Sequence, residues 1–367
     1  MRMPSSMHSS VVRFATGLLA LTCLLALAVV HKPVVQAAAT ASGLEATNSV
    51  APTANISLFI PMVLRADPYA AWVSLGQPTG VAAVNFVYIS QSCAGDLPAT
   101  ILAGTDNGLY SFNARWVHNL SLPSAISVSH IISTTAGLFL GSYDDGLWHS
   151  TDNGATWVSV ALPNLDSRIY WLTASSDYIY VAGEQGVYRK SGTGGDWSVI
   201  RAQPVYVIAA TGRNVYAAVV GNPKDTLLIS SDGGNTWPVQ RQLPGAINFV
   251  QTLDAALVTP QLLIGTVGGG LYMLDGTDTI VPFSQGVNAT VYGIWRDSQA
   301  RIYAALAAPG GLRRFPAAGG ASDFNLSTLP SGGSLTTETL YTVNGSQQCN
   351  VIVVGSKSGN VWVRRVP

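Results

Sequence analysis

Four acidic residues stand in short polar turns between apolar runs of this chain, and residues of this type could carry out acid–base chemistry. They are Asp106, Asp144, Asp145 and Glu184. A glycoside hydrolase needs two carboxylates flanking one glycosidic bond, one of them with a raised pKa, so turns that lean towards a common site could supply the pair. Aspartate is also a favoured hairpin-turn residue, and turn formation is the simpler interpretation.

Polar residues beside these carboxylates extend the candidate site. Three share the same turns, and two arginines lie on connections that lead into the next apolar runs; the five are Asn107, Tyr143, Gln185, Arg168 and Arg201. Side chains of these types donate or accept hydrogen bonds. We predict that they contact a ligand if the turns converge.

Other catalytic patterns are missing from the sequence. It contains no G-x-S-x-G elbow, no H-E-x-x-H and no phosphate-binding loop. After the first forty residues, histidine occurs only as His118, His130 and His149, which lie in separate segments. We therefore predict no metal site, and no cofactor.

An octapeptide with the pattern S-x-D-x-G-x-T-W occurs twice, at 150–157 and at 230–237. Its aspartate can accept N–H bonds within its own turn, its glycine permits a positive φ, its threonine suits entry into a strand, and its tryptophan can be buried under the hairpin. The residues concerned are Ser150, Asp152, Gly154, Thr156, Trp157, Ser230, Asp232, Gly234, Thr236 and Trp237. The octapeptide resembles the Asp-box of sialidase-like β-propellers, and this resemblance implies a structural role for both aspartates.

A longer pattern recurs around these boxes, in which a turn containing glycine is followed by an apolar residue and an aromatic one. The copies lie at 103–110, 141–148, 183–188, 265–272 and 355–362, with weaker members near 220–228 and 305–312. Seven units with a period of about 40 residues are typical of four-stranded propeller blades. We predict an all-β fold, a seven-bladed β-propeller with antiparallel blades. A six-bladed ring would require one weak unit to be an insertion.

The two ends of the repeat region predict how the ring closes. The segment 361–367 reads as a third strand with no fourth strand after it, and 71–75 reads as a fourth strand with no blade before it. Pairing the N-terminal strand with the C-terminal blade would remove both exposed sheet edges.

The N-terminal residues predict export. Arg2 and Arg13 precede an apolar run at 14–30, and a small-residue cleavage site follows at 37–39. We predict a signal peptide at 1–39, a flexible spacer with a short apolar segment at 40–68, and the propeller at 69–367. The apolar run is long enough that an uncleaved membrane anchor stays open as an alternative. A secreted or otherwise extracytoplasmic location is expected.

Two cysteines remain after the signal, Cys93 and Cys349, and each follows the innermost predicted strand of its blade. Their blades are neighbours across the closure, and both loops emerge on the same face. In an oxidising compartment we predict a disulfide between them, with two free thiols as the alternative.

Charge excludes one class of partner. Charged residues make up 10% of the chain, and removing Arg2, Arg13 and Lys32 with the signal leaves sixteen basic residues against nineteen acidic ones. Nucleic-acid binding proteins carry a basic patch, and this chain has none, so we predict no nucleic-acid partner. A monomer is expected.

The resemblance to Asp-box propellers also bears on function. True sialidases carry an arginine triad, a tyrosine–glutamate pair and an F-R-I-P-like start, and this chain lacks that start. Xyloglucan-cleaving relatives pair two rings, whereas this chain has repeats for one. It is more similar to exported photosystem II assembly factors, which are single rings without enzymatic activity. We therefore expect an exported, non-enzymatic binding or assembly scaffold that recognises a protein or glycan at the channel mouth. A glycoside hydrolase that uses the acidic turns is the alternative.

Overall fold

The structure is a computed structural model that describes residues 71–366, apart from 165–166, 220–225, 253–261, 278, 323 and 326–334. The chain divides into two units, Met1–Val63 and Leu64–Pro367. All described residues belong to the second unit. The predicted signal peptide at 1–39 and spacer at 40–68 lie outside the described residues.

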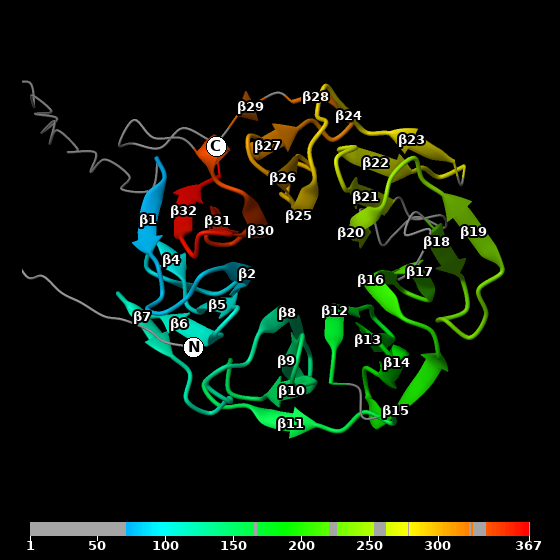
Figure 1. The fold of residues 1–367 in the computed structure, drawn as a ribbon, viewed down its shortest axis with the longest axis horizontal. Coiled ribbons are helices and arrows are strands. Elements are labelled where there is room, and N and C mark those ends of the chain that lie inside the picture. Colours follow the sequence, from blue (N-terminus) through cyan, green and yellow to red (C-terminus); the bar gives the residue numbers. More distant parts are fainter. Residues whose placement is uncertain are drawn as a thin grey trace, which may run out of the picture. The chain divides into compact units, whose positions relative to one another are not determined.

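The described residues form seven blades around a central channel, and each blade is a four-stranded antiparallel sheet (Figure 1). The predicted all-β, seven-bladed propeller is confirmed. From the channel outwards, blades 1 to 3 contain β2 (Val84–Ile89), β5 (Ile101–Thr105), β6 (Gly108–Phe112) and β7 (Trp116–His118); β8 (Val128–Thr134), β9 (Gly137–Ser142), β10 (Leu147–Ser150) and β11 (Val158–Val160); and β12 (Ile169–Ala174), β13 (Tyr178–Gly183), β14 (Gly186–Ser191) and β15 (Gly194–Arg201).

The remaining blades follow the same order. Blades 4 to 7 contain β16 (Val205–Thr211), β17 (Asn214–Val219), β18 (Thr226–Ser230) and β19 (Val239–Gln242); β20 (Ile247–Thr252), β21 (Leu262–Thr266), β22 (Leu271–Leu274) and β23 (Ile280–Pro282); β25 (Val291–Arg296), β26 (Ile302–Leu306), β27 (Gly311–Phe315) and β29 (Phe324–Asn325); and β30 (Leu340–Ser346), β31 (Val351–Ser356), β32 (Val361–Arg365) and β1 (Val73–Gly76). Outside the blades lie the hairpin of β3 (Cys93–Ala94) with β4 (Leu97–Pro98), the parallel pair β24 (Ser284–Gln285) and β28 (Gly320–Ala321), and the 3-10 helix η1 (Leu335–Thr337).

The ring closes as predicted, because the N-terminal strand completes the C-terminal blade. β1 pairs antiparallel with β32, with Val73 opposite Val363 and Ser74 opposite Trp362. The first and last strands of the ring therefore share one sheet, and neither leaves an open edge there.

A small residue in the second strand of every blade allows the blades to pack closely. These residues are Gly104, Gly141, Ala182, Ala218, Gly265, Ala305 and Gly355. A Cβ on Gly104 would collide with Val128, and a Cβ on Gly355 would collide with Val84; in both cases the neighbour is the first residue of the next inner strand. The small residue near the start of each repeated unit is therefore explained by contact between blades.

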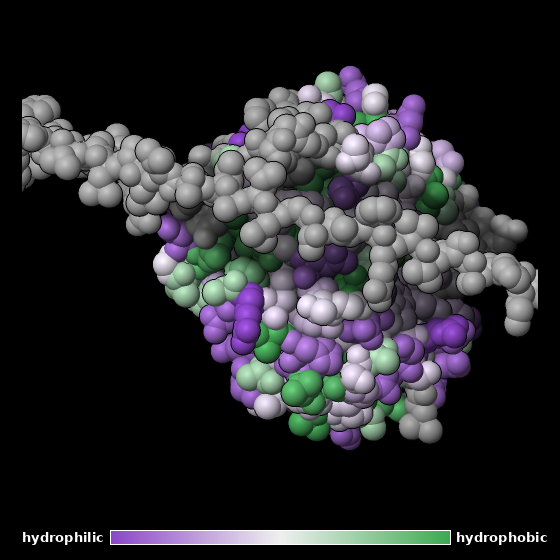
Figure 2. All heavy atoms as spheres, turned by 60° about the vertical axis from the view of Figure 1, so that its left-hand side comes forward, coloured by the Kyte–Doolittle hydropathy of each residue, from purple (hydrophilic) through white to green (hydrophobic). Residues whose placement is uncertain are grey.

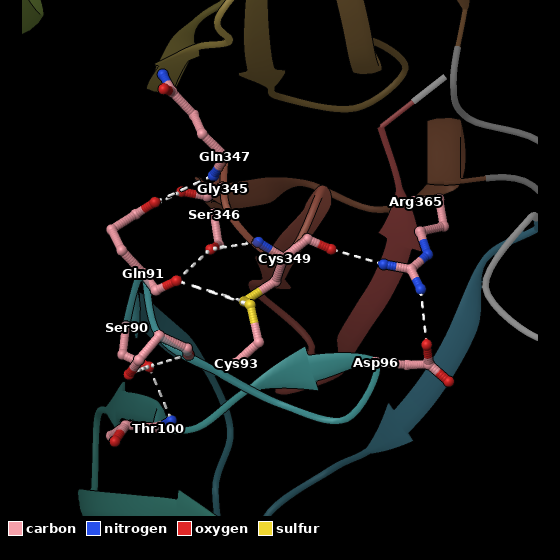
Figure 3. The surroundings of a disulfide bond; sticks show 11 residues. Ser90, Gln91, Cys93, Asp96, Thr100, Gly345, Ser346, Gln347, Cys349 and Arg365 are labelled. Atoms are coloured by element: carbon pink, nitrogen blue, oxygen red, sulfur yellow. Dashed lines mark hydrogen bonds and ion pairs between the residues drawn. A yellow bond between two sulfur atoms is a disulfide. The ribbon is translucent and has the colours of Figure 1, made fainter.

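Loops at the closure bring the two cysteines together (Figure 3). Cys93 and Cys349 form a disulfide with 5.6 Å between their Cα atoms, within the range usual for such bonds. Arg365 supports the same seam, since its guanidinium donates to the Cys349 carbonyl at 2.6 Å and pairs with Asp96 at 2.8 Å. Both cysteine loops follow the ends of inner strands, on the face that also carries the third-to-fourth strand hairpins of the two octapeptides.

The outer surface mixes side chains of opposite character. On the side of the ring that contains β1 and β7, hydrophilic and hydrophobic residues alternate over short distances (Figure 2). This surface fits a chain in which only 10% of residues are charged. No helix in the described part of the chain is long and apolar enough to cross a membrane.

Candidate binding site at the channel mouth

The seven inner strands enclose a cavity of about 870 Å³ along the channel. Each inner strand starts with an apolar residue that is at most 5% exposed and packs between blades. In every blade the next residue is skipped in the pairing with the second strand, which makes a β-bulge. Because a bulge turns a side chain away from the regular pleat, it can direct that residue into the channel. The skipped residues all line the cavity: Asn85, Ser129, Tyr170, Tyr206, Asn248, Tyr292 and Tyr341.

Four of the seven bulge residues are tyrosines, and their rings contact one another. Tyr170 and Tyr206 stack with centroids 4.7 Å apart and planes 6° apart, and Tyr292 meets Tyr341 edge-on at 5.0 Å. Tyr143, from the turn between β9 and β10, adds a fifth ring 6.4 Å from Tyr170. The mouth is therefore an aromatic surface contributed by five blades.

The tyrosine hydroxyls gather closely enough to affect one another. Burial, followed by the neighbouring Tyr206, Tyr341 and Tyr170, raises the pKa of Tyr143 to about 12. The Tyr143 side chain is nevertheless 41% exposed, because its accessible part faces the cavity. Tyr143 is thus neutral at physiological pH, and its hydroxyl can both donate and accept hydrogen bonds.

The two asparagines of the bulge layer have a different role. Asn85 donates its amide N–H to the Val128 carbonyl of the next inner strand at 2.9 Å, and Asn248 does the same to the Val291 carbonyl at 2.7 Å. These bonds tie neighbouring blades together. The tyrosines, by contrast, present ring faces and edges to the channel.

A second aromatic layer lies one residue further along the inner strands. Its rings follow one another in contact. The ring centroids of Phe86 and His130 lie 4.1 Å apart, those of His130 and Trp171 also lie 4.1 Å apart, and Trp171 meets Phe249 edge-on with centroids 5.0 Å apart. On the other side of the channel this layer has only Gly293 and Thr342. Burial lowers the pKa of His130 to about 3, so its imidazole is neutral.

The predicted carboxylates lie on the mouth face, and two of them bind the backbone. Asp106 accepts from the Ala82 N–H at 3.1 Å and from the Ala83 N–H at 3.0 Å. Asp144 accepts from the Ser127 N–H at 3.1 Å and from the Ser142 hydroxyl. In both blades the carboxylate fastens the segment that enters the inner strand. Burial, and then the neighbouring Asp144, raise the pKa of the exposed Asp145.

The other predicted site residues lie in turns of the mouth face or at the end of an outer strand. Glu184 pairs with Arg168 at 3.4 Å, and both side chains are about half exposed. Asn107 donates to the Gly80 carbonyl at 3.2 Å, and Gln185 is exposed in its turn. Arg201 ends β15, the outermost strand of blade 3, and is not among the residues that line the cavity.

The bulge tyrosines were not predicted, although the sequence carries a signal for them. Each follows the apolar residue that opens an inner strand, in the pairs Ile169-Tyr170, Val205-Tyr206, Val291-Tyr292 and Leu340-Tyr341. Tyr143 was predicted because it stands in a polar turn. The repeated apolar–tyrosine pair could have been found by aligning the seven units on their inner strands.

In the two octapeptides the aspartate accepts the same hydrogen bonds, whereas the tryptophans differ, because the indole N–H of Trp237 has no partner among the described residues. Asp152 accepts from the Thr156 N–H at 2.8 Å and from its hydroxyl at 2.6 Å, and Asp232 accepts from Thr236 at 3.0 and 2.7 Å. The threonine hydroxyl bond, followed by the backbone bond, lowers the pKa of Asp152 to about 2, and the same bonds lower that of Asp232. Trp157 is buried and donates to the Gly154 carbonyl at 3.1 Å.

Comparison with known proteins places the chain among β-propellers by fold. No protein-family model and no curated protein matches its sequence. Among solved structures, the extracellular domain of the BT4673 protein of B. thetaiotaomicron matches with a TM-score of 0.61 at 13% identity, over 80% of this chain and 40% of that one. YCF48 from Cyanidioschyzon merolae matches with a TM-score of 0.57 at 15% identity, over 81% of this chain and 99% of its own length. YCF48 bound to D1 peptide matches with a TM-score of 0.60 at 13% identity, over 82% of this chain and 98% of that one.

Proposed function

We propose that this protein is an exported propeller of the Asp-box class that acts as a binding scaffold, and that it recognises a segment of a protein or glycan at the tyrosine-lined channel mouth. The observation that carries the proposal is the bulge layer. Seven identical backbone irregularities turn side chains inwards, and four of them present tyrosines over a cavity of about 870 Å³. Tyrosine combines an apolar face with a polar tip, which suits it to recognition surfaces.

The structural neighbours support a scaffold. One is YCF48 bound to D1 peptide, and another is a chain of the mitotic checkpoint complex, which matches with a TM-score of 0.61 at 11% identity over 88% of this chain and all of that one. Those proteins bind peptides or other proteins. At such low identity the likeness shows the fold alone, so binding by this chain rests on its own mouth.

Export is supported by the basic and apolar residues at 1–30 and by the disulfide that joins Cys93 to Cys349. Disulfides persist in oxidising compartments. The spacer at 40–68 would separate the ring from a membrane if the signal segment were retained.

Binding can be tested with the full chain on peptide and glycan arrays, beside the double variant Tyr206→Leu/Tyr341→Leu. We expect the double variant to lose the bound ligands, and Val158→Ala, at a 70%-exposed site on the outer strand β11, to keep them. Binding that survives the double variant would place the recognition surface elsewhere on the ring.

Glycan hydrolysis is a second candidate, favoured by the raised pKa of Asp145. A general acid needs such a shift. Product release from a glycan panel should then fall in Asp145→Asn and Glu184→Gln, whereas turnover that is unchanged in the variant lacking all four turn carboxylates would exclude these residues as catalysts.

A further inference from the structure

Polar atoms in the channel lack hydrogen-bond partners, and this points to a ligand that enters it. In the part of the chain that the structure describes, the Ser129 hydroxyl, the Nδ1 atom of His130 and the amide oxygen of Gln251 have no partner. Ser129 is 4% exposed and His130 is 7% exposed, and all three residues line the cavity. Buried polar groups are usually paired, so a set without partners around one cavity is unusual.

The three unpaired groups share the ability to accept hydrogen bonds. A hydroxyl oxygen and an amide oxygen are acceptors, and a neutral imidazole has one acceptor nitrogen. Because burial keeps His130 uncharged, the imidazole would not repel a positive ligand. A ligand that satisfies these groups therefore needs several N–H or O–H donors.

The charges at the mouth favour a cation. On the turns and connections of the mouth face and at the strand end beside them, the described residues include three cations, Arg168, Arg201 and Lys357, and five carboxylates: Asp106, Asp144, Asp145, Glu184 and Glu338. Of the five, Glu184 is paired with Arg168. None of these charged residues lines the cavity, but an excess of carboxylates on the turns around its mouth raises the local concentration of cations there.

The aromatic rings favour the same ligand. The mouth presents Tyr143, which is 41% exposed, and Tyr206, which is 38% exposed, and the Tyr292–Tyr341 pair lies across two further blades. The face of an aromatic ring attracts ammonium and guanidinium groups, more strongly when they are partly removed from water.

We propose that the channel receives a basic side chain, the ammonium of a lysine or the guanidinium of an arginine, which passes the tyrosines and donates hydrogen bonds towards Ser129 and His130. The proposal rests on the proposed binding function and names its ligand. Acceptors without partners, ring faces and excess carboxylates each favour a donor-rich cation. A carboxylate or phosphate would be repelled by the carboxylates of the mouth and by the negative faces of the rings.

The test uses small probes with neutral counterparts of the same shape. N-acetyl-arginine amide is compared with N-acetyl-citrulline amide, and N-acetyl-lysine amide with its Nε-acetylated form, on the full chain. Binding is followed by calorimetry and by the fluorescence of Trp171, which lies in the channel. We expect at least one cationic probe to bind about tenfold more tightly than its neutral counterpart.

Variants then locate the site. Tyr341→Phe keeps the ring and should keep the affinity, whereas Tyr341→Leu should weaken it several-fold. His130→Phe removes the unpaired nitrogen, keeps a ring between Phe86 and Trp171, and should weaken the cationic probe. The matched control is His149→Phe, because His149 lies outside the channel, stacks on Phe139 at 4.4 Å and is bonded to the Ala136 carbonyl. A thermal melt of each variant separates loss of binding from loss of folding.

The outcomes separate this inference from the proposed function. Equal affinity for charged and neutral probes would overturn the inference that the ligand is a cation. The proposed binding site at the mouth would still stand. Array ligands whose binding depends on Tyr206 and Tyr341 but that contain no lysine or arginine would also overturn the cationic ligand and support the binding site. If the affinity for the cationic probes is unchanged in both Tyr341→Leu and His130→Phe, the probes bind outside the channel.

Discussion

The two ends of the channel are made from the same seven inner strands, but they use their side chains in opposite ways. At the far end, where the inner strands finish, the Cys93–Cys349 disulfide and the hydrogen bonds of Arg365 join the first and last blades. At the mouth, where the inner strands begin, bulges turn tyrosines towards the cavity. At the far end the polar groups bond to one another within the protein, whereas at the mouth the tyrosines face the cavity.

The difference shows how a rigid ring can carry a binding surface. The aspartates of the two octapeptides, Asp152 and Asp232 on the far face, accept hydrogen bonds from their own turns. Along the channel, the Ser129 hydroxyl and the Nδ1 atom of His130 have no hydrogen-bond partner within the described segments. Unused hydrogen-bonding groups destabilise a fold slightly, and such groups are common at functional sites.

The largest effect should come from removing the disulfide at the far end. The bond spans 256 residues, so the double variant Cys93→Ser/Cys349→Ser should lower the free energy of unfolding by about 2–5 kcal/mol. Denaturant unfolding measures the change. Ligand binding at the mouth should be unaffected in the folded double variant, and a matching loss of affinity would show that the two ends are not independent.

Packing between blades should give the next largest effect. In Gly104→Ala the new methyl group would collide with Val128 of the next blade, which should cost about 1–3 kcal/mol. Ala305→Gly, at the same position of blade 6, should cost about 0.5–1 kcal/mol. Equal losses in the two variants would show that the inner strands have room to shift apart.

The aspartates of the two octapeptides should make the stability of the far face depend on pH in the acid range. The pKa of Asp152 is lowered to about 2 by the Thr156 hydroxyl and backbone, and that of Asp232 is also lowered. Their stabilisation is complete above the unfolded pKa of about 4 and is lost as the pH falls through the lower folded value. Unfolding of the wild type at pH 5, 3 and 2 should show this loss, and Asp152→Asn/Asp232→Asn should flatten it. An unchanged slope in the double variant would assign the acid sensitivity to other groups.

Much of the fold was predictable because it is repeated. Seven units at a fixed spacing indicated the blades, and unmatched strands at the two ends of the repeat region indicated the closure that the β1–β32 pairing confirms. The glycine before the apolar–aromatic pair, such as Gly108, was read as part of a turn. A different glycine of the same units, Gly104 or Gly355, lies in the second strand and contacts the next blade, and this role depends on distances between units that one sequence does not contain.

The candidate site was predicted only in outline. Asp106, Asp144 and Glu184 lie in the polar turns on the face where the inner strands begin, but none of them lines the cavity, and Asp106 and Asp144 hold backbone N–H groups. The sequence did not indicate the β-bulge in the inner strands. Without it, an alternating strand pattern assigns residues such as Tyr170 to one face of the sheet or the other, and the pattern does not reveal that the second position points into the channel.

The smallest effect on stability should come from the mouth, and it would sharpen the contrast between the two ends. Tyr206 is 38% exposed and stacks on Tyr170, so Tyr206→Phe, which keeps the ring, should change the free energy of unfolding by less than about 0.5 kcal/mol. Asn85→Ala breaks a hydrogen bond between blades in the same layer and should cost about 0.5–1.5 kcal/mol. Denaturant unfolding of both variants makes the comparison. A larger loss in Tyr206→Phe than in Asn85→Ala would mean that the tyrosine hydroxyls hold the ring together, and the mouth would then be a structural end like the other.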